Sequence, residues 1–181
     1  MFKISNHLLE KAEFIESPNF SERPNNYDLS LLVFHNISLP PGEFGGSHIK
    51  DFFTNTLDLS ASTYFQGLKE EKVSSHLLID RKGHLIQFVP FNKSAWHAGV
   101  SSFEGRENCN DFSIGIEIEG TDDILYTDAQ YLTLQSVSKC LIKAFPKILL
   151  DNIVGHSDIS PNRKTDPGKS FDWKRFRESL V

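Results

Sequence analysis

A length of 181 residues fits a single domain and leaves enough chain to bury a core. The composition, with 39% hydrophobic and 24% charged residues, is that of an ordinary soluble protein, and 15 phenylalanines predict an aromatic-rich core. The formal net charge of -5 argues against a nucleic-acid or anionic-membrane partner, because binding to either depends on a basic surface. We therefore predict one domain over residues 1–181, with an irregular N-terminal lead at 1–28 and a core at 29–181.

The beginning of the chain has no features of a secretory signal. MFKISNHLLEKAEFIESPNF lacks an apolar run of about 7–15 residues followed by a small-residue cleavage site. No stretch approaches the roughly 20 apolar residues that a membrane-spanning helix needs. Without a signal, Cys109 and Cys140 are expected to be free thiols in a reducing compartment rather than a disulfide. We therefore expect a cytoplasmic protein, and we expect it to be a monomer.

The first predicted element is a strand, LSLLVFHN, because it is a continuous apolar run of strand length. A Pro/Gly-rich loop, ISLPPGEFGG, follows it. The next segment, SHIKDFFTNTL, is predicted to be a short helix, since its apolar residues have helical spacing and Ser47 can cap its start. VSSHLLIDRKGHLIQFVP then contains two strand-like runs joined by DRKG, a pattern that predicts a hairpin.

The second half of the chain continues to mix strands and helices. FSIGIEIEG alternates, which predicts a strand whose isoleucines face the core and whose Glu117 lies on the opposite, non-core face. Thr127 and Gln130 form a capping box for a helix that Pro146 ends. A short strand, NIV, leads into His156, and SFDWKRFRESL closes the chain as a helix. Because strands and helices are intermingled, we predict an α/β or α+β fold with a mixed central sheet flanked by helices.

Three separated residues suggest a metal site. His35 and His156 each follow a strand-like run, at a position where a rigid sheet commonly holds functional groups. Asp166, which precedes a Pro-Gly turn, supplies a third possible ligand. Two histidines and a carboxylate with an open fourth position describe a hydrolytic zinc site. Other interpretations remain open, because His35 can be a hydrogen-bonded histidine at a strand end and Asp166 can be a turn former.

Hydrolysis at such a site needs a base for the attacking water and a positive neighbour for the oxyanion. Glu117 is a candidate base, and Lys164, two residues before Asp166, is a candidate donor to the oxyanion. A glutamate on a polar strand face is also commonly just solvated. The spacing of these residues has no tight signature, so it supports a metal-dependent hydrolase only as a hypothesis.

Several long motifs, in the same order, resemble the cytoplasmic 1,6-anhydro-N-acetylmuramoyl-L-alanine amidases of the AmpD type. The motifs are HNISLPPGEFGG, VSSHLLIDRKG, FVPFNKSAWHAGVSSFEGRENCNDFSIGIEIEGTD, YTDAQY and GHSDISPNRKTDPGKSFDWKRF. The resemblance implies the fold shared by type-2 amidases and peptidoglycan recognition proteins. It also implies hydrolysis of the amide between anhydro-muramic acid and L-alanine in cell-wall muropeptides, during peptidoglycan recycling. In some bacteria this activity restrains induction of a β-lactamase.

The resemblance implies roles for five residues of this chain. It makes His35, His156 and Asp166 the ligands of a zinc ion, through the motifs LVFHN, GHSD and KTDPG. Glu117 in GIEIEG and Lys164 in RKTDPG match the two catalytic residues of the family. The candidate ligands and catalytic groups named from chemistry above are therefore the same ones that the resemblance implies.

The expected substrate contacts are Asn36, next to the first ligand, and Trp96 and His97 in the motif AWHAG. Trp96 can alternatively be an ordinary core residue. His76 is expected either near the site or as a buried, hydrogen-bonded histidine.

Two positions depart from the family pattern: Lys72 stands where an arginine is frequent, and GRENCND carries an asparagine where many relatives have a second arginine. Lysine and asparagine cannot grip a stem-peptide carboxylate with two parallel hydrogen bonds, and Arg106 can substitute for the missing arginine.

Three other functions fit parts of the sequence. A peptidoglycan-binding module without activity is disfavoured, because all five metal-ligating and catalytic residues are present. A general amidase of the cell envelope is disfavoured by the absent signal sequence and by the long PPGEFGG insertion. A hydrolase that uses Cys140 is disfavoured because a small thiol beside an apolar helix stripe is usually a buried structural residue. One that uses Cys109 is disfavoured because His97 is near it in the sequence only.

Overall fold

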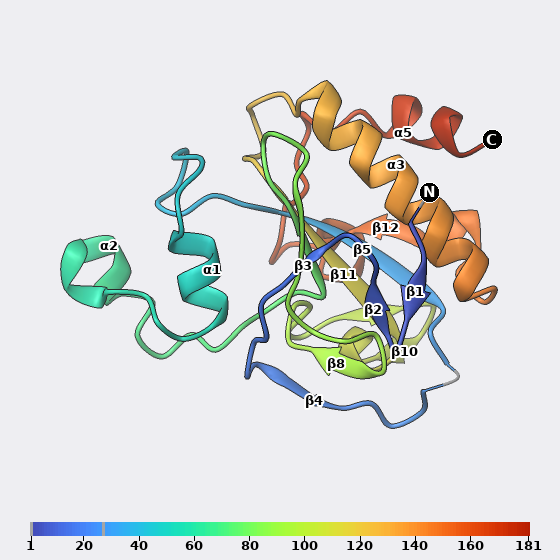
Figure 1. The fold of residues 1–181 in the computed structure, drawn as a ribbon, viewed down its shortest axis with the longest axis horizontal. Helices are drawn as coiled ribbons and strands as arrows, with labels where there is room; N and C mark the ends of the chain where they lie inside the picture. The colour runs from blue at the N-terminus through green and yellow to red at the C-terminus, as the bar shows by residue number, and fades with distance from the viewer. Residues whose placement is uncertain (1, 27) are drawn as a thin grey trace.

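The computed structural model describes residues 2–26 and 28–181, and its centre is a six-stranded mixed sheet (Figure 1). The strand order is β12-β5-β11-β6-β7-β3. Neighbouring strands are parallel except for β6 and β7, which form an antiparallel hairpin. The bounds of these strands are β3 Glu13–Phe14, β5 Leu31–Ile37, β6 Leu77–Ile79, β7 Leu85–Gln87, β11 Ser113–Glu119 and β12 Ile153–Gly155. The predicted α/β fold with a mixed central sheet is confirmed.

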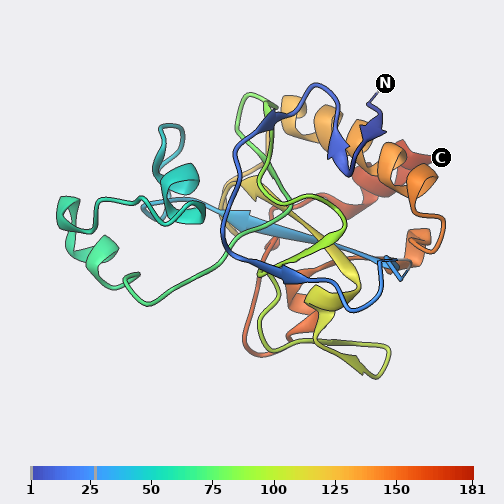
Figure 2. The same cartoon turned by 60° about the horizontal axis from the view of Figure 1, so that its bottom comes forward.

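Two helices, α3 (Asp128–Ala144) and α5 (Trp173–Leu180), cover one face of this sheet (Figures 1 and 2). The predicted capping box starts α3, since the Thr127 hydroxyl accepts the Gln130 amide and the Gln130 side chain accepts the Thr127 amide. The isoleucines of β11 face these helices, together with Phe34 of β5. Phe34 is fully buried and stacks on Trp173 at a ring-centroid distance of 5.6 Å.

The opposite face of the sheet is also covered, which corrects the expectation of a non-core face on β11. Val33 of β5 packs there against Ala98 and Phe112, from the long segment between β8 (Lys93–Ala95) and β11. Parallel strands are normally covered on both faces, so the alternation in FSIGIEIEG separates two buried environments rather than core from solvent. Glu117 therefore lies in a partly enclosed setting.

The N-terminal lead is more regular than its sequence suggests. Strands β1 (Ile4–Ser5) and β2 (Leu8–Leu9) form a small antiparallel pair, β3 joins the edge of the main sheet, and β4 (Phe20–Glu22) pairs with β8. The expectation of an irregular lead at 1–28 is therefore wrong at these four strands, because tertiary pairing orders segments that are too short to show periodicity. Residues 1 and 27 of that lead lie outside the described residues.

A lobe made by α1 (His48–Phe53) and α2 (Thr63–Gln66) extends from one end of the sheet (Figures 1 and 2). Ser47 precedes α1 but does not cap it, because its hydroxyl donates to the Asp51 carboxylate instead. The lobe is attached through buried Asn19, whose side-chain amide donates to the carbonyls of Phe53, at 3.2 Å, and Val73, at 2.8 Å. One side chain thus joins both ends of residues 54–72.

The remaining elements are short. They are β9 Ser102–Phe103, β10 Arg106–Glu107, α4 His156–Ile159, and the 3-10 helices η1 Leu59–Ala61, η2 Cys109–Asp111 and η3 Leu150–Asn152. Both cysteines are free, as predicted. In the described part of the chain, no helix is both long enough and apolar enough to cross a membrane.

Candidate metal centre and cavity

The central strands bring the predicted site residues to one place. His35 of β5 and Glu117 of β11 are partners in the parallel register, so their side chains leave the same face of the sheet as neighbours. His156 starts α4 directly after β12, the strand on the other side of β5. Because carboxyl ends of parallel strands meet at one edge, these residues collect there.

The loop that carries Asp166 is fixed against the end of β12. The Ser157 amide donates to the Asp166 carbonyl at 3.0 Å, and the Tyr126 hydroxyl donates to the Pro167 carbonyl at 2.7 Å. A Cβ atom at Gly155 would lie 2.7 Å from Pro167, so the close approach of the two segments depends on this glycine. The Asp166 carboxylate is thereby held beside the two histidines.

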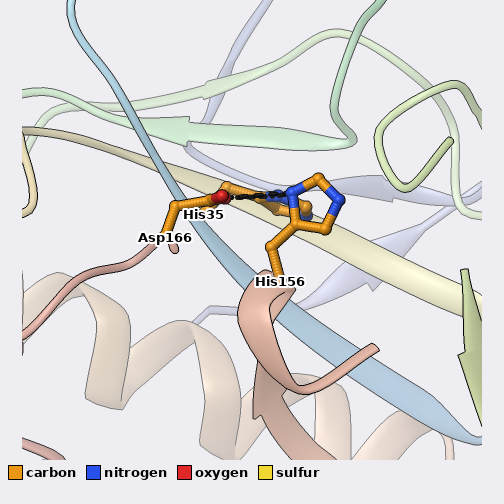
Figure 3. Close-up of side chains that lie close together, drawn as sticks. All are labelled: His35, His156 and Asp166. Atoms are coloured by element: carbon orange, nitrogen blue, oxygen red, sulfur yellow. Dashed lines mark hydrogen bonds and ion pairs between the residues drawn. The ribbon is translucent and has the colours of Figure 1, made fainter. Parts of the chain in front are cut away.

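Three potential ligand atoms converge in this cluster (Figure 3). His35 Nδ1 lies 2.9 Å from His156 Nδ1 and 3.1 Å from Asp166 Oδ2. His156 Nδ1 lies 3.0 Å from the same Asp166 oxygen. The side chains come from β5, α4 and the following loop, and they point at one another. Two imidazole nitrogens and one carboxylate oxygen are the ligand types of catalytic zinc sites.

Neighbouring groups leave these atoms available to a cation. His156 Nε2 lies 3.0 Å from the Ala98 carbonyl, which can only accept, and 3.2 Å from the Arg163 guanidinium, which can only donate. When Nε2 donates to the carbonyl, Nδ1 presents a lone pair to the cluster. Burial is the main influence on His35 and lowers its pKa to about 4, so its imidazole is neutral at pH 7. Burial opposes ionisation of Asp166, but the two adjacent histidine rings keep the pKa of its carboxyl below the ordinary value. The donor set therefore fits a divalent metal ion.

Glu117 and Lys164 line a cavity of about 680 Å³ together with these three residues. The Oε2 atom of Glu117 is buried and has no hydrogen-bond partner among the residues that the structure describes. Burial, followed by the negative charge of Asp166, raises the pKa of Glu117 well above its ordinary value, while Lys164 opposes the shift. The site thus contains a carboxyl group with a buried oxygen to which no described residue forms a hydrogen bond, which suits a general base.

The expected substrate contacts are only partly found at this cavity. Asn36, Trp96 and His97 line it. The Asn36 amide donates to Asp122 Oδ1 at 2.8 Å, and the Trp96 indole donates to Ser21 Oγ at 2.7 Å. These bonds fix the two side chains at the wall.

Neither Lys72 nor Arg106 is among the described residues that line the cavity. Arg106 instead binds Asp28 at 2.7 Å and covers the Phe112 ring at 3.8 Å. The structure therefore does not support the expectation that Arg106 replaces a carboxylate-binding arginine, because an ion pair and a ring hold its guanidinium elsewhere.

Sequence reasoning missed one whole wall of the cavity. The α1–α2 lobe contributes Phe52, Phe53, Tyr64 and Leu68. Asp122, just after β11, also lines the cavity. No motif marks the lobe positions, since aromatic residues in a short amphipathic helix are also typical of a core, and Asp122 ends a quoted motif without an expected role.

The sequence predicts His76 either near the site or as a buried, hydrogen-bonded histidine, and the structure shows the second. It is not among the described residues that line the cavity. Its Nδ1 accepts the Gly115 amide at 3.0 Å, and burial, then the Arg23 charge, lower its pKa to about 3. Below about pH 6.5 the unfolded chain takes up a proton here that the folded protein does not. We therefore expect the free energy of unfolding to fall as the pH drops from about 6.5 toward 3, by at most about 1.4 kcal/mol per pH unit for this residue.

Urea unfolding at several pH values tests this expectation. His76→Gln should flatten the pH dependence, and His84→Gln, at a histidine whose side chain is 73% exposed, is the matched control. If the free energy of unfolding of His76→Gln depends on pH as steeply as that of the unaltered protein, His76 is not the cause of the predicted loss of stability in acid.

The fold and the site together define a family. The sequence pattern of the N-acetylmuramoyl-L-alanine amidase family matches residues 25–169, and the chain therefore belongs to this family. Among similar proteins, the 1,6-anhydro-N-acetylmuramyl-L-alanine amidase AmpD of Citrobacter freundii is 57% identical over 169 residues, which cover 93% of this chain and 90% of the relative.

Solved structures agree with this assignment. A crystal structure of a selenomethionine derivative of AmpD matches with a TM-score of 0.95 and 54% identity, covering 98% of this chain and 99% of that one. AmpDh3 from Pseudomonas aeruginosa, in complex with anhydromuramic pentapeptide, matches with a TM-score of 0.65 and 30% identity, covering 87% and 62%. The chain is thus an N-acetylmuramoyl-L-alanine amidase of the AmpD type, and the resemblance noted in the sequence is confirmed.

Proposed function

We propose that this amidase is zinc-dependent and hydrolyses the amide between 1,6-anhydro-N-acetylmuramic acid and L-alanine in cell-wall muropeptides. The convergence of His35 Nδ1, His156 Nδ1 and Asp166 Oδ2 within one cavity is the observation that carries the proposal of zinc. The anhydro sugar is proposed because relatives that match nearly the full chain are named for it. AmpDh3 binds an anhydromuramic peptide with the same fold, which also supports it.

His35, His156 and Asp166 would hold the ion, and when bound it supplies Lewis acidity toward the amide carbonyl and toward a water molecule. Glu117 removes a proton from the attacking water as the water oxygen bonds to the carbonyl carbon. Lys164 donates to the oxygen that gains negative charge. Glu117 then gives the proton to the alanine nitrogen as the C–N bond breaks. The second proton of the water passes from the new carboxyl group to the amine, so a lactyl carboxylate and a peptide with an ammonium group at its alanine leave.

The walls of the cavity offer both apolar rings and polar groups, which supports a ligand that contains a sugar and a peptide. Trp96 offers an apolar ring and Asn36 an amide close to the proposed ligand His35. The α1–α2 lobe adds Tyr64 and Leu68 on the wall. We propose that these residues position the substrate, in a cytoplasmic and monomeric enzyme of peptidoglycan recycling.

The test is to incubate the purified protein with anhydro-muramoyl tripeptide or with intact murein, before chelation, after it and after zinc is added back. Peptide release is followed by mass spectrometry. We expect cleavage of the anhydro fragment alone, loss of cleavage on chelation and recovery with zinc. Release from intact murein would favour a general wall amidase, and activity that survives complete removal of metal would overturn the zinc proposal.

A further inference from the structure

The His97 ring lies directly behind His35, on the side away from the converging ligand atoms. His35 Nε2 is 2.9 Å from His97 Nδ1, and the two rings meet edge to face with centroids 5.0 Å apart. The second nitrogen of His97, Nε2, is 3.0 Å from the Ser113 hydroxyl. Both nitrogens of His97 are therefore engaged inside the protein, although the sequence suggested that this imidazole would bind substrate.

Strand β11 forms a seat for this ring. Ser113 and Gly115 are two residues apart, so they leave the strand on the same face as Glu117. A Cβ atom at Gly115 would lie 2.5 Å from His97 Cγ, so only a glycine leaves room for the imidazole. The backbone of the same segment is held too, since Asn110 Oδ1 accepts the amides of His97, at 3.2 Å, and Ala98, at 2.8 Å.

The hydrogen bonds of this group permit two arrangements of protons. In one, His35 Nε2 donates to His97 Nδ1, His97 Nε2 donates to Ser113, and His35 Nδ1 presents its lone pair to the ligand cluster. In the other, Ser113 donates to His97, His97 donates to His35 Nε2, and His35 Nδ1 carries a proton toward Asp166. Only the first arrangement allows His35 to bind a metal ion, because a ligating nitrogen needs a free lone pair.

We propose that His97 is a positioning residue of the metal centre, which accepts the Nε2 proton of His35 and so keeps His35 Nδ1 free to bind the ion. This inference rests on the zinc centre of the proposed function. Outer partners of this kind orient metal-bound histidines and fix their tautomer, and losing one typically lowers metal affinity about 10- to 100-fold. His97 acts through His35 and needs no contact with the substrate.

The test compares His97→Leu with His97→Asn by competition for zinc against a chromogenic chelator. The Asn Oδ1 atom can take the place of the imidazole Nδ1 as an acceptor, whereas the Leu side chain, of similar size, cannot accept. We expect His97→Leu to bind zinc about 10- to 100-fold more weakly and His97→Asn to stay within about threefold of the unaltered protein. Urea unfolding of the metal-free proteins separates this effect from a loss of stability.

A second measurement needs no variant. In nitrogen-15 NMR spectra of the unaltered zinc-loaded protein, we expect Nε2 of His35 to carry the ring proton. We expect Nδ1 of His35 to show the change in chemical shift that zinc binding causes. A proton on Nδ1, or zinc affinity of His97→Leu equal to that of the unaltered protein, would overturn the role of His97. If the unaltered protein itself binds no zinc, the zinc centre fails, and that outcome is distinct from failure of the inference alone.

Discussion

Replacing Glu117 by glutamine should reduce kcat about 100- to 10,000-fold while leaving KM and zinc affinity nearly unchanged. Glutamine has almost the same shape, but it cannot take a proton from water or return one to the leaving nitrogen. Burial, and then the charge of Asp166, raises the pKa of Glu117 above its ordinary value, which makes its carboxylate a stronger base toward water. Steady-state hydrolysis of anhydro-muramoyl tripeptide, with zinc content measured on the same samples, provides the test.

Two controls make the outcome decisive. Glu178→Gln makes the same chemical change on α5, in a side chain that is 68% exposed, and should keep full activity. Cys109→Ser should also retain activity, because burial raises the pKa of that thiol and leaves it a poor nucleophile. Full activity of Glu117→Gln would contradict the proposed mechanism. Loss of activity in Cys109→Ser would support the alternative of a cysteine hydrolase.

Phe34→Ala should lower the free energy of unfolding by about 3–5 kcal/mol. Phe34 is fully buried in β5, and it touches the rings of Phe171, Trp173 and Phe176. Removing the ring loses apolar burial and leaves a cavity between the central strand and α5. Because the free energy of unfolding of a domain is commonly about 5–15 kcal/mol, this single substitution should remove a large part of it.

Urea unfolding followed by circular dichroism checks this value, provided that the slope against denaturant stays constant. Leu132→Ala is the matched control, since Leu132 lies on α3 with 62% of its surface exposed, and it should change stability by no more than about 0.5 kcal/mol. A loss below about 1 kcal/mol for Phe34→Ala would show that the aromatic cluster is not the main anchor of β5.

The elements with strong local signals were predictable from the sequence. The apolar run of β5, the alternation of β11 and the capping box of α3 each depend on residues close together in the chain. The lead strands were not predictable, because segments of two or three residues show no periodicity and form only by pairing with distant partners.

The same distinction applies to the site. Motifs marked the residues that the structure gathers at the cavity, among them His35, Glu117 and Lys164. The position of His97 behind His35 depends on contact with Gly115, 18 positions farther on, which no spacing rule signals. The ion pair that takes Arg106 away from the cavity is equally invisible, since Asp28 is 78 residues away in the chain.

The attachment of the α1–α2 lobe through Asn19 has a consequence for how this amidase can change over evolution. The Asn19 side chain holds together the two carbonyls that flank residues 54–72. The length of this segment can therefore vary without moving the strands that carry His35 and Glu117. The residues of the central strands and the part of the cavity wall that the lobe supplies thus lie in separate parts of the chain. We therefore expect that residues 54–72 can be exchanged for the corresponding segment of a relative without moving His35 or Glu117.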